Sequence, residues 1–177
     1  GLQALEAAKA AAAGASLEEL LTLLDSLAAR TFAFASLSTL EYLRRGGRIS
    51  NIGTQIASLL DIKPIMKMNH GKAGMEVART RRRALERVVS LTASLGRLEA
   101  IGFTHANAAD EVAALREHLA PYTAGLPEAV ISDVTPAIGA HVGPGAVCAV
   151  LLAAEAPSGP GPNPMQRIRQ TFKTLAG

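Results

Sequence analysis

Apolar and polar positions follow two different periods along the chain, and the changes of period mark the elements that we expect. Residues 2–13 are strong helix formers that end before Gly14. Ser16 and Glu19 then form a capping box ahead of a stripe of leucines at helical spacing, between positions 17 and 27. The first thirty residues therefore predict two helices that need a further layer to pack on.

Beyond residue 30, short runs with strand character alternate with helical patterns. The predicted strands span 31–36, 61–68, 73–77, 98–105, 129–134 and 146–154. The predicted helices lie near 40–45, from about 51 to 60, over 80–95 and over 108–120, where Pro121 ends the last of them. This alternation predicts an α/β layered domain, and a hairpin turn at 69–72 favours a mixed β-sheet flanked by helices.

The length of 177 residues suits one domain with a proper core, and 49% hydrophobic with 19% charged residues is typical of a globular protein. In this interpretation residues 31–155 form the α/β domain and residues 1–30 precede it as two helices. Residues 156–177 follow as a Pro/Gly-rich linker with a short basic tail.

Composition also bears on partners and compartment. Aromatic residues make up only 3% of the chain, which argues against stacking platforms and hence against a nucleic acid partner. The single cysteine, Cys148, excludes an internal disulfide and fits a reducing compartment. No apolar run approaches the length of a transmembrane helix, and the N-terminus does not resemble a signal peptide, so we expect a cytoplasmic protein with no integral membrane segment.

The positive charge of the chain is concentrated in one segment. The formal net charge is +3, and residues 79–87 alone hold five arginines against one acidic residue. Arg79, Arg81 and Arg82 begin the helix predicted over 80–95. Such a patch can meet phosphate or an acidic partner protein, or it can be a solvated helix end.

A first candidate for ligand chemistry is the stretch from Leu40 to Ser50. A helical turn runs into Gly46 and Gly47, which are followed by Arg48 and Ser50. We expect Gly46 to take the left-handed conformation that ends a helix, and Gly47 to allow close approach of a backbone or ligand. Arg48 would then lie at the mouth of a loop.

A second candidate is a glycine-rich loop around His141. Gly139, Gly143 and Gly145 frame this imidazole, which can donate a hydrogen bond or a proton near neutral pH. No group of residues has usable metal-ligand spacing, and the chain contains no Gly-x-Ser-x-Gly motif, dinucleotide fingerprint or P-loop. Arg48 and His141 together suit an anionic head group on an apolar body.

These motifs support a family resemblance. The strings LEYLRRGGRIS, SLLDIKPIM, ARTRRRAL and VTPAIGAHVGPGAV closely resemble the C-terminal lobe of the DegV family of bacterial fatty-acid-binding proteins, from Leu2 to about Glu155. The resemblance implies that residues 1–30 are the last helices of an N-terminal lobe that is otherwise absent from the sequence, and that the tail after Glu155 has no counterpart.

The resemblance also implies a ligand and a partner. In that family a long-chain fatty acid lies in a tunnel between two lobes, and an arginine and a histidine of these motifs help to hold its carboxylate. Carried over, those residues are Arg48 and His141, with Ser50, Gly47, Gly139 and Gly143 around them. Some members present the fatty acid to a separate kinase, and the resemblance implies a docking role for Arg79, Arg81 and Arg82.

We therefore expect a carrier without catalytic activity, with no cofactor and with fatty acid as its ligand. The alternative is an enzyme or kinase subunit that binds a phosphorylated or carbonyl substrate similar to dihydroxyacetone, with His141 as acid, base or attachment point. A long apolar tunnel would favour the lipid and a small polar pocket the sugar-like substrate. A third hypothesis is a plain interaction domain that uses the basic helix. An apolar face left uncovered by a missing lobe would favour a homo-oligomer.

Overall fold

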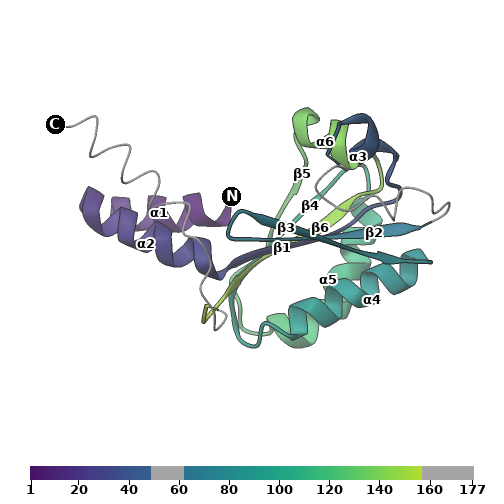
Figure 1. Ribbon diagram of the computed structural model, residues 1–177. Helices are drawn as coiled ribbons and strands as arrows, with labels where there is room; N and C mark the ends of the chain where they lie inside the picture. Colours follow the sequence, from purple (N-terminus) through teal and green to yellow (C-terminus); the bar gives the residue numbers. More distant parts are fainter. Residues whose placement is uncertain (49–61, 157–177) are drawn as a thin grey trace.

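The computed structural model describes residues 1–48 and 62–156, and its centre is a six-stranded mixed sheet in the order β3-β2-β1-β6-β4-β5 (Figure 1). The strands are β1 (Thr31–Ser36), β2 (Lys63–Asn69), β3 (Lys72–Ala78), β4 (Leu98–His105), β5 (Val130–Asp133) and β6 (Val147–Ala153). The helices are α1 (Leu2–Ala12), α2 (Leu17–Arg30), α3 (Glu41–Arg45), α4 (Arg81–Ala93), α5 (Ala109–Thr123) and α6 (Pro136–Val142). Only β4 and β5 pair in parallel, so the predicted mixed sheet preceded by two helices is confirmed.

Local sequence signals account for the boundaries of the first elements. The amide of Glu19 donates to Ser16 Oγ at 3.3 Å and the amide of Ser16 donates to Glu19 Oε2 at 2.8 Å, which is the predicted capping box. Gly14, with φ +92°, ends α1. His70 and Gly71 both have positive φ in the tight turn that joins β2 to β3.

The two faces of the sheet differ in the size of their side chains. Along β1, Phe32 and Phe34 are buried on the face covered by α4 and α5, where they join the main core (Figure 1). Ala33 and Ala35 alternate with them and point to the other face, because successive strand residues point to opposite sides. One face of the sheet is therefore covered by α4 and α5 over large apolar side chains, and the other face carries small residues along β1.

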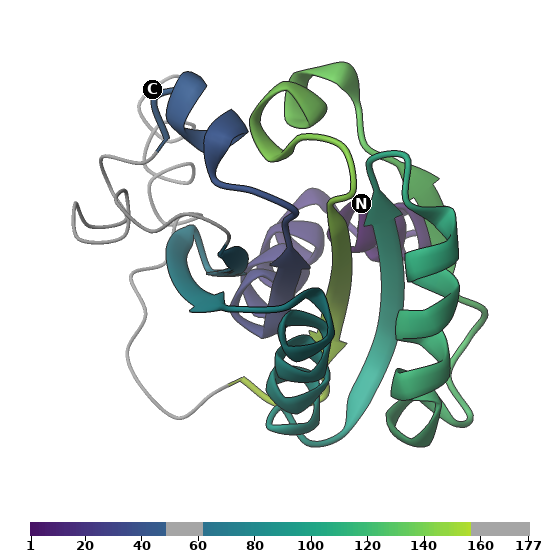
Figure 2. The same cartoon turned by 90° about the vertical axis from the view of Figure 1, so that its right-hand side faces the viewer.

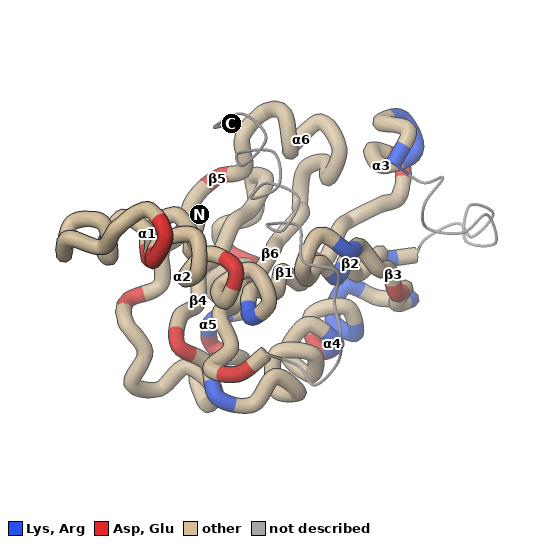
Figure 3. The backbone as a smooth tube through the Cα atoms, turned by 60° about the vertical axis from the view of Figure 1, so that its left-hand side comes forward, with Lys and Arg blue, Asp and Glu red and all other residues tan. Residues whose placement is uncertain are grey.

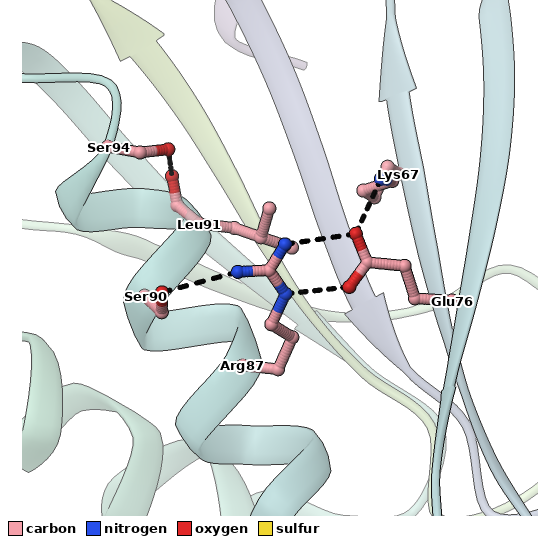
Figure 4. A network of polar contacts seen from close by, with 6 residues as sticks. All are labelled: Lys67, Glu76, Arg87, Ser90, Leu91 and Ser94. Carbon is pink, nitrogen blue, oxygen red and sulfur yellow. Dashed lines mark hydrogen bonds and ion pairs between the residues drawn. The ribbon is translucent and has the colours of Figure 1, made fainter.

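A polar network centred on Glu76 fixes α4 to the hairpin (Figure 4). Arg87 of α4 donates to both carboxylate oxygens of Glu76 on β3, from Nε at 2.6 Å and from Nη2 at 3.0 Å. Lys67 of β2 donates to the same carboxylate at 2.6 Å. The Arg87 guanidinium and then the Lys67 ammonium lower the pKa of Glu76 to about 2.

Two sequence predictions are wrong in detail. Helix α5 continues through Pro121 to Thr123, so the proline does not end it, although it lacks the N–H that would donate to Glu117 O. The segment that carries His141 is the short helix α6, which begins at Pro136, and not a loop. The helix predicted over 51–60 and the tail from 157 lie outside the described residues.

Candidate functional site

The fold brings the two candidate motifs together. Helix α3 follows the carboxyl end of β1 and helix α6 precedes the amino end of β6, and these ends are adjacent because Ser36 pairs with Val147. Helices α3 and α6 lie side by side above the face of the sheet opposite α4 and α5 (Figures 1 and 2). We call residues 37–48 the α3 segment and residues 135–146 the α6 segment.

At the end of α3, each of the two glycines has the role that we predicted for the other. Gly47, with φ +66°, takes the left-handed conformation, and Arg48 N donates to Leu43 O at 2.9 Å. Gly46 has φ −75° and remains right-handed. Gly46 is the position of close approach, since a Cβ there would lie 2.2 Å from His141 Nδ1. A Cβ on Gly47 would have no atom of the described residues within 4 Å.

Two glycines of the α6 segment also lie in close contact with side chains of the α3 segment. A Cβ on Gly143, which has φ +72°, would lie 2.2 Å from the Tyr42 ring. A Cβ on Gly145 would lie 2.2 Å from Ser38 Oγ, while one on Gly139 would make only an ordinary contact with Val134. Gly143 and Gly145 thus allow the two segments to interlock. The ligand contacts that the sequence predicted for Gly139 and Gly143 stay a prediction.

His141 and Arg48 occupy different environments. His141 is half-buried, and its Nδ1 has no hydrogen-bond partner among the described residues. Arg48 is exposed, and its Nη1 donates to Gly46 O at 3.0 Å. Ser50, the third polar residue predicted for the site, lies outside the described residues.

Both residues line one cavity of about 460 Å³ on the small-residue face of the sheet. The remaining lining is almost wholly apolar: Ala33, Ala35, Leu37, Leu43, Met66, Met68, Ala73, Thr104, Val134, Ile138, Val142, Ala146, Val147 and Cys148. Its volume falls within the range typical of small-molecule sites. The site therefore combines an apolar body with a cation and an imidazole.

The register of the strands explains the floor of this cavity. Directly opposed residues form a row across four strands, from Met66 through Ala35 and Cys148 to Thr104. The small residues stand in the middle of the row, so the sheet surface is lowest along β1 and β6. Burial raises the pKa of the Cys148 thiol to about 12, which keeps this floor uncharged.

The arginines predicted to dock a partner do not share one environment. Lys and Arg positions gather at α3, β2 and α4 (Figure 3). Arg79 is exposed. The Arg82 side chain is 84% exposed and lies 3.6 Å from the Glu86 carboxylate. Arg81 is turned inward, with a side chain 23% exposed that contacts Glu111, Ser36 and Gly145. Arg81 is therefore a poor candidate for the docking surface, because its donors are occupied within the domain.

Other possible sites in the described part of the chain are less suited to this chemistry. A second cavity, of about 450 Å³, lies between α5 and the 124–129 loop and has the charged residues Arg116, Glu117 and Glu128 in its lining. Within residues 1–48 and 62–156, no three His, Cys, Asp or Glu side chains group closely enough to hold a metal ion. None of the described helices combines the length and apolar character needed to span a bilayer.

Sequence reasoning missed most of the cavity floor. The alternation Phe32-Ala33-Phe34-Ala35 carried a signal, because alanine on every second position of a strand predicts one shallow face. Met66, Thr104 and Cys148 gave no such signal, since their positions in one row with Ala35 depend on strand pairing.

Comparison with known proteins agrees with the motif resemblance. The model of the DegV family, a family of uncharacterised proteins, matches residues 1–154. A DegV domain-containing protein of Streptomyces coelicolor is 36% identical over 148 residues, which are 82% of this chain and 53% of that protein. One from Clostridium acetobutylicum is 38% identical over 153 residues, or 83% of this chain and 52% of that protein. The chain thus spans about half the length of these relatives.

Solved structures show the same fold. A DegV family protein from Thermus thermophilus, described for its fatty acid binding, superposes with a TM-score of 0.75 at 30% identity, covering 86% of this chain and 56% of that one. DegV of Bacillus subtilis, described as a fatty acid binding protein, superposes with a TM-score of 0.71 at 29% identity and the same coverage.

Proposed function

This chain belongs to the DegV family, and we propose on that basis that it binds a long-chain fatty acid in the cavity between the sheet and helices α3 and α6. The observation that carries the proposal is the composition of this cavity, an apolar trough with Arg48 and His141 in its lining. The alkyl chain would lie along β1 toward Ala33, and the carboxylate would lie beside Arg48 and His141.

The energetics of such a ligand match the lining. Each methylene buried contributes about 0.8 kcal/mol, so a long chain gains affinity by area alone. Arg48 and His141 would add charge-assisted hydrogen bonds to the carboxylate and so fix the orientation of the chain. Among the described residues no hydrogen bond ties Nδ1 of His141, which faces Gly46, to the rest of the fold.

We propose a carrier role without catalysis, since nothing in this binding mode requires a covalent bond to break. The alternative, a phosphorylated or carbonyl substrate similar to dihydroxyacetone, is less well supported because such a substrate needs more polar partners than this lining offers. The polar side chains of the lining are those of Arg48, Thr104, His141 and Cys148.

We propose that a second lobe completes the site. Relatives are about twice as long, so we propose that residues 1–30 are the last helices of a preceding lobe and that this lobe covers the cavity. If the cavity is uncovered, exposed apolar side chains such as Met68 and Ile138 would favour association of two copies.

Arg79 and Arg82 remain the proposed docking site for a fatty-acid kinase or another acidic partner. Both side chains are exposed, and electrostatic docking requires accessible charge. Reversing both charges in R79E/R82E should slow association most strongly at low salt. Unchanged association kinetics at low ionic strength would exclude this surface.

The proposed function is tested by native mass spectrometry of the purified chain, followed by extraction and fatty-acid analysis. Titration of a fatty acid and the alcohol of equal length into wild type, R48Q and H141Q then tests the head-group residues. We expect both variants to lose about tenfold or more in affinity for the acid and little for the alcohol. H118Q, which changes an exposed histidine of α5, is the matched control. Failure of wild type to bind either ligand would refute the proposal for this chain.

A further inference from the structure

Arg81, the first residue of α4, sends its side chain into the domain instead of into solvent. Its Nη1 donates to Ser36 Oγ at 2.8 Å, and its Nη2 donates to Gly145 O at 2.8 Å. Nε and Nη2 both face the Glu111 carboxylate at the start of α5. One guanidinium therefore joins four parts of the chain.

Two of these partners lie where the α3 segment and the α6 segment join the sheet. Ser36 is the last residue of β1, from which the α3 segment with Arg48 departs. Gly145 lies four residues after His141, in the turn through which the α6 segment returns to β6. The α3 segment and the α6 segment hold the head-group residues. Both segments are thus hydrogen-bonded to the same side chain, that of Arg81, at the points where they join the sheet.

We propose that Arg81 is a positioning residue for the head-group site, which sets the α3 segment and the α6 segment at the spacing that Arg48 and His141 need. This inference rests on the proposed function for its ligand, but the geometry that it describes is a property of the empty protein. It replaces the docking role that the sequence predicted for Arg81.

The surroundings of Arg81 suit a rigid connection. Ser36 is fully buried, so its hydroxyl has no water to replace the guanidinium. The turn is also held by Gly145 N, which donates to Ala106 O at 2.7 Å, and by Ala106 N, which donates to Ala146 O at 2.9 Å. Desolvation lowers the pKa of Arg81, and Glu111 supplies the opposite charge that the half-buried guanidinium requires.

Only an arginine can make this set of contacts. A guanidinium presents five N–H donors in a planar fork, whereas a lysine ammonium is a single point of charge. Lysine at position 81 can keep an ion pair with Glu111, but its single nitrogen cannot reproduce the separate bonds that Nε, Nη1 and Nη2 of Arg81 make. R81K therefore removes the connection while preserving the charge, and R82K makes the same change at the exposed neighbour.

The test uses the full chain without ligand. Hydrogen exchange of the Gly145 amide and the NMR signal of the His141 ring are compared in wild type, R81K and R82K. In R81K we expect Gly145 exchange to accelerate about tenfold to a hundredfold, because the turn loses the charge-assisted hydrogen bond that Gly145 O accepts from Arg81. We also expect a shifted His141 signal. The His118 ring signal and the amides of β3 should stay unchanged, and R82K should match wild type throughout.

The opposite result is equally clear. The proposal would be overturned if the Gly145 amide of R81K exchanged at the wild-type rate and the NMR signal of its His141 ring were unshifted. A uniform acceleration of amide exchange over the whole sheet would also overturn it. If R81K does not fold, S36A removes one contact with a smaller change, and the same local signature at His141 is then required.

Ligand binding adds a separate readout. If wild type binds fatty acid, R81K should lose affinity for the acid more than for the alcohol, although Arg81 does not line the cavity. If wild type binds neither, the proposed function fails while the exchange and ring-signal comparison still decides the role of Arg81.

Discussion

Shortening the cavity at its far end gives the most informative prediction for the alkyl chain. Ala33 lies on the cavity floor, one strand period before Ala35 and further from α3 and α6. Its neighbours across the strands are Met68 and Val150. Leucine at position 33 would project three additional carbons into the space that a long acyl chain would occupy.

The expected magnitude follows from the methylenes displaced. Three methylenes at about 0.8 kcal/mol each amount to about 2.4 kcal/mol, or about 60-fold weaker binding of chains long enough to reach Ala33. Fatty acids shorter by three or more methylenes should bind A33L as they bind wild type. The melting temperature should stay level or rise, because the leucine fills apolar space.

Calorimetric titration with a series of saturated fatty acids measures this length dependence. A12L, which makes the same change at an exposed position of α1, is the matched control and should show the wild-type series. An equal loss of affinity at every chain length, or no loss at any length, would refute the orientation of the chain along β1.

Three further predictions concern Gly46, Glu76 and Cys148. G46A places a methyl group against the His141 ring. It should lower the free energy of unfolding by about 2 kcal/mol and shift the His141 NMR signal. The control G74A, which has room for a Cβ, should give neither effect. Because the pKa of Glu76 is lowered to about 2, its stabilisation is complete above the unfolded-state value of 4.5 and is lost as pH falls toward 2. E76Q should therefore cost about 1 kcal/mol near pH 7 in denaturant titrations, a figure reduced for solvent screening, and nothing near pH 2. With a thiol pKa of about 12, Cys148 should be alkylated at pH 8 at least about 100-fold more slowly than a free cysteine, and denaturant should abolish the difference.

The local elements were predictable because their signals are local. The capping box at Ser16 and Glu19, the hairpin turn at His70 and Gly71, and the alternation of phenylalanine and alanine in β1 each act within a few residues. Pro121 misled the prediction, since its effect depends on how near it lies to the end of the helix.

The roles of single residues at the site were less predictable. The sequence marked Gly46 and Gly47 but could not distinguish them, because only the neighbouring His141 makes Gly46 the position of close approach. Arg81 and Arg82 are adjacent and chemically identical, yet one faces Glu111 in the domain and the other faces solvent. Which arginine turns inward depends on where α5 and the Gly145 turn lie.

The sequence by itself determined the α/β class, the main strands and helices, and the motif residues Arg48 and His141, since periodicity and residue type act along the chain. The tertiary structure alone decided that α3 lies beside α6, that Ala35 and Cys148 stand in one row, and that Arg81 joins both segments. These relations unite residues about 40 to 110 positions apart, and they arise from strand order and packing, which no local pattern specifies.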